Sequence, residues 1–153
     1  MSASRACLFR LITVSAMGLM VAGCESVNKL SNLTGPTPDL APTFSSIQLA
    51  VIQSSGSNPQ RCIACHTSQG RNPAAGLDLS ANAFSGLVNV ASRNKPGATL
   101  VVPGDPDNSY VIQKLEGATG IVGRQMPFNG PPYLTAGQIQ IIRRWILLGA
   151  KND

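Results

Sequence analysis

The clearest hydrophobic pattern of the chain lies near its C-terminal end. Ile139, Ile142 and Ile146 recur at spacings of three and four residues, which place them on one face of a helix. Thr135 and Gln138 precede this stripe at the spacing of a capping box, in which the two side chains accept hydrogen bonds from the first turn's backbone. The pattern therefore predicts an amphipathic helix that begins just after Thr135.

A second apolar stripe follows Thr43. Phe44, Ile47 and Val51 share one face of a helix if Thr43 caps its N-terminus. Gly56 and Pro59 are expected to end this helix.

Two shorter helices are predicted between these stripes. Ser80 is placed to cap a helix that runs through Leu87, and Asp105 followed by Pro106 is a typical helix start. The second of these helices is expected to stop at Gly117. No stretch alternates clearly between apolar and polar residues over the length of a strand. The pattern predicts an all-α fold of about four short helices joined by long loops.

The first 23 residues have the composition of an export signal. Arg5 and Arg10 begin a segment whose residues 11–22 are mostly apolar. This run is too short to span a bilayer as a stable helix. It also lacks the alternation of polar positions that a buried amphipathic helix requires.

The end of this segment, Val21-Ala22-Gly23-Cys24, resembles the lipobox of bacterial lipoproteins. The resemblance implies a signal over 1–23 and a lipid on Cys24 that anchors the chain without spanning the membrane, on the periplasmic side. An ordinary secretory signal followed by an unrelated cysteine is the alternative. Residues 24–42 are polar and contain prolines, which predicts a flexible tether and leaves 43–153 as the folded domain.

The charge of the chain is weak evidence for a polyanionic partner. The formal net charge is +5, and loss of residues 1–23 would leave ten basic against seven acidic residues. No run of basic residues with interleaved aromatics is present, so nucleic acid is not expected as a partner.

The strongest chemical signal is the segment Cys62-Ile63-Ala64-Cys65-His66. Thiols at positions i and i+3 share one side of a helical turn, so both can form thioethers with the vinyl groups of one porphyrin. His66, the only histidine of the chain, can then supply an axial nitrogen to the iron. The motif predicts one covalent haem c.

Three other interpretations of the motif explain less. A structural zinc site needs four nitrogen or sulfur ligands, and the cluster offers three. A thioredoxin-like dithiol needs a βαβ setting, which the sequence does not predict. A disulfide between Cys62 and Cys65 gives no reason for the adjacent histidine.

The second axial ligand is predicted by elimination. Met126 is the only methionine that remains once residues 1–23 are removed. Its loop contains Gly120, Gly123 and Pro131, residue types that let a backbone pass close to a flat ring and limit its alternatives. Core packing is the alternative role for this thioether.

Together, the Cys62–His66 motif, the late Met126-Pro127 pair and the amphipathic C-terminal helix resemble a class I c-type cytochrome. The segments 76–80 and 102–110 resemble single-haem domains of bacterial exported proteins, and the resemblance covers about 44–150. It implies a small fold of about four helices around one haem, with the first and last helices packed together.

The resemblance also implies finer details of the haem site. Trp145 should lie near the crossing of the first and last helices, and the carbonyl of Pro73 should accept a hydrogen bond from the second nitrogen of His66. Arg71, Arg93 and Lys95 are candidate partners of the haem propionates, although a solvated surface position explains each of them too.

These inferences predict a membrane-tethered electron carrier rather than an enzyme. Its partners would be redox proteins that donate and accept electrons. Two alternatives are a haem enzyme or gas sensor with an open iron position, and a haem module docked onto a larger respiratory or dehydrogenase complex. Ligation of the iron by Met126 separates the first alternative from a carrier.

The lipobox generates a first testable prediction. Cys24→Ala should leave an unprocessed precursor or move the product from the membrane to the soluble fraction, because the residue that carries the lipid is lost. Fractionation and N-terminal mass analysis measure both. A soluble wild-type protein whose mature sequence starts elsewhere than Cys24 would contradict lipidation.

Overall fold

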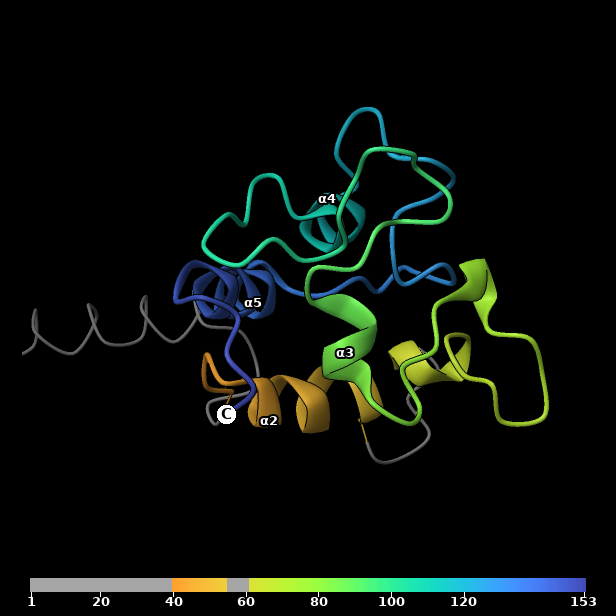
Figure 1. Ribbon diagram of the computed structural model, residues 1–153, viewed down its shortest axis with the longest axis horizontal. Helices are drawn as coiled ribbons and strands as arrows, with labels where there is room; N and C mark the ends of the chain where they lie inside the picture. The colour runs from red at the N-terminus through yellow and green to blue at the C-terminus, as the bar shows by residue number, and fades with distance from the viewer. Residues whose placement is uncertain (1–39, 55–60) are drawn as a thin grey trace, which may run out of the picture. The chain divides into compact units, whose positions relative to one another are not determined.

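The computed structural model describes residues 40–54 and 61–153 (Figure 1). The predicted signal, Cys24 and most of the predicted tether lie outside the described residues. Within them, four α-helices are present: α2 (Phe44–Ile47), α3 (Ala83–Leu87), α4 (Tyr110–Glu116) and α5 (Ala136–Leu147). The residue pairs with β-type bonding in these ranges are isolated bridges and form no strand. The all-α prediction is therefore confirmed.

Three tighter or wider helical turns complete the secondary structure. A π-helix, η1 (Gln48–Gln53), continues α2 directly. The 3₁₀ turn η2 (Cys62–Ala64) lies within the predicted haem motif, and a second one, η3 (Ala74–Gly76), follows the motif. No helix in the described ranges is long and apolar enough to cross a membrane.

The helix predicted after Thr43 is confirmed as α2 and its continuation η1. The hydroxyl of Thr43 accepts a hydrogen bond from the backbone nitrogen of Ser46 at 3.4 Å, as an N-cap should. Phe44, Ile47 and Val51 are buried. The residues of the apolar stripe thus all stay buried, although the helix changes from α- to π-type along its length.

The C-terminal helix begins as predicted. The Thr135 hydroxyl accepts from the Gln138 nitrogen at 3.2 Å, and the Gln138 side-chain oxygen accepts from the Thr135 nitrogen at 2.9 Å. This capping box satisfies two backbone donors that would otherwise lack partners. The buried face of α5 consists of Gly137, Ile139, Ile142, Trp145 and Ile146.

The predicted start of α3 is wrong. Asn82, not Ser80, caps this helix, and its side-chain oxygen accepts from the Ser85 nitrogen at 3.1 Å. Ser80 instead donates to Asp78 Oδ1 through both its nitrogen (2.9 Å) and its hydroxyl (2.6 Å). A short polar side chain therefore closes a local turn before the helix can begin.

The predicted start of α4 is also wrong, whereas its end is confirmed. Asp105 accepts hydrogen bonds from Asn108 at 3.1 and 2.7 Å and closes a turn, so the helix starts four residues beyond Pro106, after Ser109. It stops at Gly117, whose φ of 67° is left-handed and favours glycine.

The first and last helices pack together through aromatic rings. The ring centroids of Phe44 and Trp145 lie 5.5 Å apart, and Phe44 meets Phe84 of α3 edge to face at 5.3 Å. The Phe44 nitrogen also donates to a carboxylate oxygen of Asp153 at 2.8 Å. These contacts confirm the position expected for Trp145. On the other side of α5, Arg143 pairs with Glu116 of α4 at 3.2 Å and with Asp107.

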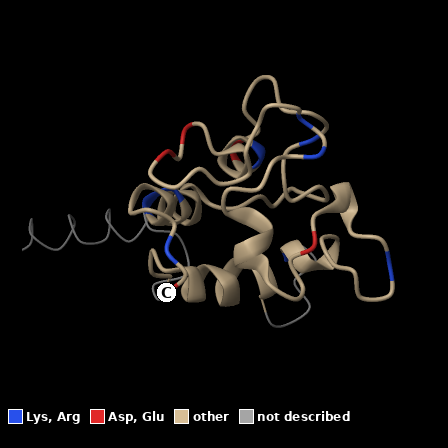
Figure 2. Ribbon diagram, viewed as in Figure 1, with Lys and Arg blue, Asp and Glu red and all other residues tan. Residues whose placement is uncertain are grey.

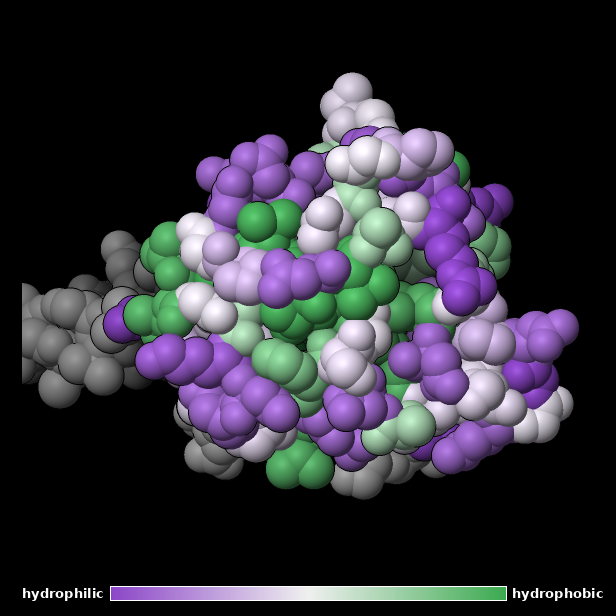
Figure 3. All heavy atoms as spheres, viewed as in Figure 1, coloured by the Kyte–Doolittle hydropathy of each residue, from purple (hydrophilic) through white to green (hydrophobic). Residues whose placement is uncertain are grey.

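Much of the domain is loop, and its apolar surface is incompletely covered. Phe128 is 58% exposed, and Val122 and Tyr133 are exposed too. Figure 3 shows apolar side chains at the centre of one face, surrounded by polar ones. In Figure 2, lysine and arginine residues lie on the loops to the right of α4, and acidic residues on the loop to its left. The loop-rich arrangement leaves room for a large ligand.

Packing on α5 can be tested with two neighbouring residues. Ile146 is fully buried, whereas Leu147 is 61% exposed. Ile146→Ala should lower the free energy of unfolding by about 2–5 kcal/mol through lost burial and a cavity. Leu147→Ala should change it by less than about 0.5 kcal/mol. Denaturant unfolding of the haem-loaded protein measures both, and equal effects would show that the packing of α5 is misassigned.

Candidate functional site

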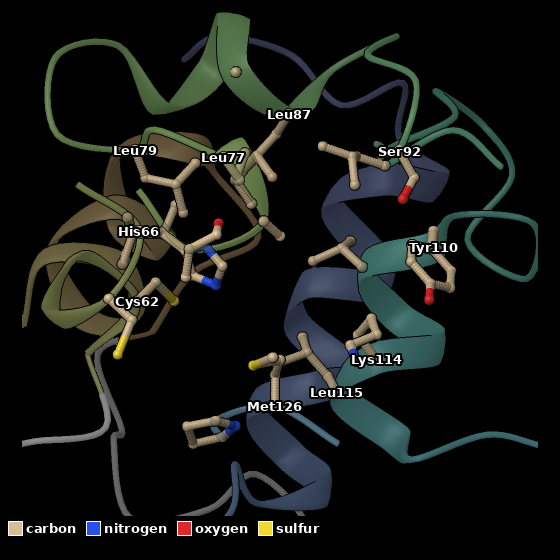
Figure 4. A pocket seen from close by; sticks show the side chains of 18 of the residues that line it. Cys62, His66, Leu77, Leu79, Leu87, Ser92, Tyr110, Lys114, Leu115 and Met126 are labelled. Atoms are coloured by element: carbon tan, nitrogen blue, oxygen red, sulfur yellow. The ribbon is translucent and has the colours of Figure 1, made fainter. Parts of the chain in front are cut away.

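A large cavity lies between the segment of the cysteine motif and helices α4 and α5 (Figure 4). Its volume is about 650 Å³, within the range of roughly 300–1,000 Å³ that is usual for ligand sites. Many of its walls are apolar and come from Phe44, Ile47, Leu77, Leu79, Leu87, Val101, Leu115, Ile142 and Trp145. Cys62, Cys65, His66 and Met126 all line it. Residues sixty positions apart in the sequence therefore meet at one site.

The cysteine motif is held by a tight local turn. The nitrogens of Cys65 and His66 both donate to the carbonyl of Cys62, at 3.2 and 2.9 Å. The Cys62 thiol lies 3.7 Å from the carbonyl of Val51, at the end of η1. The turn therefore brings both cysteines and the histidine to one wall of the cavity.

The chemistry of Cys62 argues against a thiolate function. Burial raises the pKa of the Cys62 thiol to about 11, so the thiol is protonated at neutral pH. Dithiol exchange requires a readily formed thiolate, which this burial disfavours. In addition, no group of three or more His, Cys, Asp or Glu that could hold a metal ion exists among the described residues. Zinc and thioredoxin-like roles therefore gain no support from the structure.

His66 presents one nitrogen to the cavity. Its Nδ1 lies 3.0 Å from the carbonyl of Ala74, and because a carbonyl can only accept, Nδ1 carries the proton. Nε2 keeps its lone pair for a metal. Burial is the main cause that lowers the pKa of His66, which favours the neutral imidazole that ligation needs.

The predicted partner of His66 was one residue off. Ala74, not Pro73, accepts from Nδ1. The Pro73 carbonyl accepts from the Gly76 nitrogen at 2.9 Å, inside the 3₁₀ turn η3. The Ala74 carbonyl accepts from the Leu77 nitrogen at 3.1 Å as well as from Nδ1, so both carbonyls take part in the turn, and the one that faces the imidazole is that of Ala74.

Met126 approaches from the opposite wall. Figure 4 shows its thioether beside Leu115 and Lys114 of α4, facing the cavity across from His66. The Met126 nitrogen donates to the carbonyl of Lys114 at 2.8 Å, which fixes the backbone at this point. The structure thus brings together the four haem-site residues predicted within the folded domain, and their ligand roles stay predictions.

The cavity carries more positive than negative charge. Its basic lining residues are Arg61, Arg93, Lys114 and Arg124. Hydrogen bonds, first from Ser68 and then from Ser80, lower the pKa of the lining residue Asp78 to about 2, so its carboxyl is ionised. A cation-rich cavity fits a ligand that bears carboxylates.

Among the three propionate candidates of the sequence, only Arg93 lines the cavity. The guanidinium of Arg93 packs directly against Gly76, so a Cβ added to Gly76 would lie only 2.4 Å from a guanidinium nitrogen. Lys95 instead contacts the Gln113 side chain at 3.3 Å and lies 5.0 Å from the centroid of the Tyr110 ring.

Three of these basic residues were not predicted from the sequence: Arg61, Lys114 and Arg124. Arg61 and Arg124 stand within two residues of predicted haem-site residues, a signal that could have identified them. Lys114 carried no such signal, because the fold alone brings it to Met126. Arg124 lies over the Phe128 ring, 5.2 Å from its centroid, and burial lowers the pKa of Lys114.

These residues fit a haem with iron. Two thiols and an imidazole stand on one wall, a thioether stands on the other, and apolar side chains lie between them. An imidazole nitrogen and a thioether are an axial pair that haem iron accepts, and paired cysteines suit thioether bonds to its vinyl groups.

Comparison with known proteins points to the same cofactor. A family model described as planctomycete cytochrome C matches residues 62–127. The match begins at the first motif cysteine and ends just after Met126. It supports a cytochrome c-like domain and implies covalent haem c with iron. No curated protein and no solved structure matches the chain.

The paired thiols lead to a prediction about attachment. Produced with cytochrome c maturation machinery, the wild-type protein should carry the added mass of one haem that acid-acetone does not extract. The double variant Cys62→Ser/Cys65→Ser should lose this mass, because no thioether can form. Met126→Ala serves as the control and should keep the covalent haem. An unmodified wild-type mass from competent cells would exclude haem attachment.

Proposed function

We propose that this chain is a monohaem c-type cytochrome that transfers single electrons while tethered by a lipid on Cys24 to the periplasmic side of a bacterial membrane. The observation that carries the electron-transfer role is the placement of His66 and Met126 on opposite walls of one apolar cavity, with Cys62 and Cys65 beside the histidine. The match to a cytochrome family model supports the same role.

The roles of the individual residues follow from their positions. Haem, when bound, supplies an iron that takes up and releases one electron. Cys62 and Cys65 would hold the porphyrin covalently, and Nε2 of His66 would bind its iron while the Ala74 carbonyl orients the imidazole ring. The Met126 thioether would bind the iron from the opposite wall, and a thioether ligand would raise the reduction potential relative to nitrogen or oxygen ligands.

Closing both axial positions favours a carrier over an enzyme. A six-coordinate iron has no free position for a substrate, and its geometry changes little when an electron is added. His66 is the only histidine of the chain, so no second imidazole is available as an acid or base on the far side of the iron.

Arg93 is the proposed partner of the haem carboxylates. The propionates of a haem are carboxylates, and Arg93 lines the cavity with its guanidinium beside Gly76. Arg93 forms no ion pair or hydrogen bond with other described residues. Its guanidinium is therefore available for a carboxylate.

The carrier role is tested at Met126. Met126→Ala should retain covalent haem, open the sixth position to water or carbon monoxide, and lower the midpoint potential within the roughly 0.8 V range that axial ligands control. Absorption spectra, carbon monoxide titration and redox potentiometry measure these effects. The wild type should be low-spin and bind carbon monoxide poorly. A wild type that is high-spin and binds ligands as readily as the variant would instead support an enzyme or sensor.

A further inference from the structure

The segment that carries Met126 folds back onto the helix that precedes it. Helix α4 ends at Gly117, and the chain then passes through Gly120 and Gly123, which both have positive φ angles. Residues 122–126 return along α4, so that Met126 lies beside Lys114 and Leu115 in Figure 4. The distal ligand is thus positioned by contacts with α4 rather than by regular structure of its own.

Two of these contacts satisfy the C-terminal end of α4. The last carbonyls of a helix have no partner within it. Here the Met126 nitrogen donates to the Lys114 carbonyl at 2.8 Å, and Gln125 Nε2 donates to the Leu115 carbonyl at 2.7 Å. A Cβ on Gly117 would meet the Gln125 side-chain oxygen at 2.8 Å, so a larger residue there would shift Gln125, and the positive φ favours glycine in any case.

Two side chains of α4 hold the preceding part of the loop. The Lys114 ammonium donates to the Val122 carbonyl at 2.9 Å and to the Arg124 carbonyl. One turn earlier, the Tyr110 hydroxyl accepts from the Val122 nitrogen at 2.9 Å. Lys114 forms no salt bridge within the described residues, so its charge is directed at these carbonyls. Hydrogen bonds from a charged donor are stronger than neutral ones.

We infer that Lys114 is a positioning residue that, with Tyr110, clamps the loop of residues 122–126 and so keeps Met126 at the iron. The inference rests on the proposed function, because it assumes that Met126 is the sixth ligand. A glycine-containing loop that is already ordered loses less entropy when its methionine binds the metal. Releasing the clamp should therefore increase the fraction of molecules in which Met126 leaves the iron and external ligands enter.

The test compares lysine variants on the haem-loaded protein. Lys114→Met keeps most of the apolar length of the side chain but removes its hydrogen-bond donors. It should raise the rate of carbon monoxide binding by at least about tenfold, because the loss of hydrogen bonds to a charged group shifts an equilibrium by about one to two orders of magnitude. The ferric iron–thioether charge-transfer band should weaken in parallel. Lys95→Met is the matched control, because Lys95 contacts α4 side chains but no hydrogen bond joins it to residues 122–126.

Two further variants separate positioning from general stability. Lys114→Arg keeps donors and should restore the band at least partly, whereas a merely structural role would lower the unfolding temperature without changing ligand entry well below it. Tyr110→Phe removes only one hydroxyl and should act in the same direction as Lys114→Met, so the clamp remains testable if Lys114→Met yields no folded protein. The clamp would be overturned if the wild type is low-spin and Lys114→Met binds carbon monoxide at the wild-type rate. If only Tyr110→Phe folds, the same result with that variant would overturn it. A high-spin wild type would overturn the proposed function instead.

Discussion

Two side chains sixty residues apart must face each other across one apolar cavity, and the rest of the structure depends on this constraint. His66 is placed locally, by a tight turn and by the Ala74 carbonyl on its Nδ1. Met126 is placed by tertiary contacts, through backbone and side-chain bonds to α4. Helix α4 is fixed in turn by its packing against α5, which Arg143 reinforces. An error in any of these positions would move one of the two side chains relative to the other.

The same constraint explains why the domain contains so little regular structure. Four short helices and long loops bury a modest set of side chains, and several large apolar residues stay exposed. A domain of this size has a limited core, and small folds commonly add a metal or a covalent link to become stable. A flat apolar cofactor in the cavity would extend the core through the centre of the domain. Binding of haem and folding are then coupled.

The basic side chains around the cavity have different partners. Around the cavity, Lys114 bonds the loop carbonyls, Arg124 lies over Phe128, and Arg93 has no partner within the described residues. Three side chains of equal formal charge therefore have different roles, because each one lies beside a different kind of group. Net charge alone, which gave only weak evidence for a polyanionic partner, could not distinguish among them.

The sequence by itself determined the features that depend on neighbours within about four residues. The capping box of α5, the buried stripe from Phe44 to Val51, the stop at Gly117 and the Cys62–His66 motif are all short-range patterns, and the structure reproduces them. Met126, which lines the cavity, was identifiable as a candidate ligand because so few alternatives remain in the chain, and its ligand role stays a prediction.

Only the tertiary structure decided between choices that are locally equivalent. Asn82 and Ser109 begin helices where Ser80 and Asp105 were equally suitable caps, because the latter two lie in turns closed by side-chain hydrogen bonds. Arg93 and Lys114 reach the cavity while Lys95 does not, because loops distant in sequence bring their backbones to its walls. Helical spacing determines which face a side chain occupies, but only the folded chain determines what that face meets.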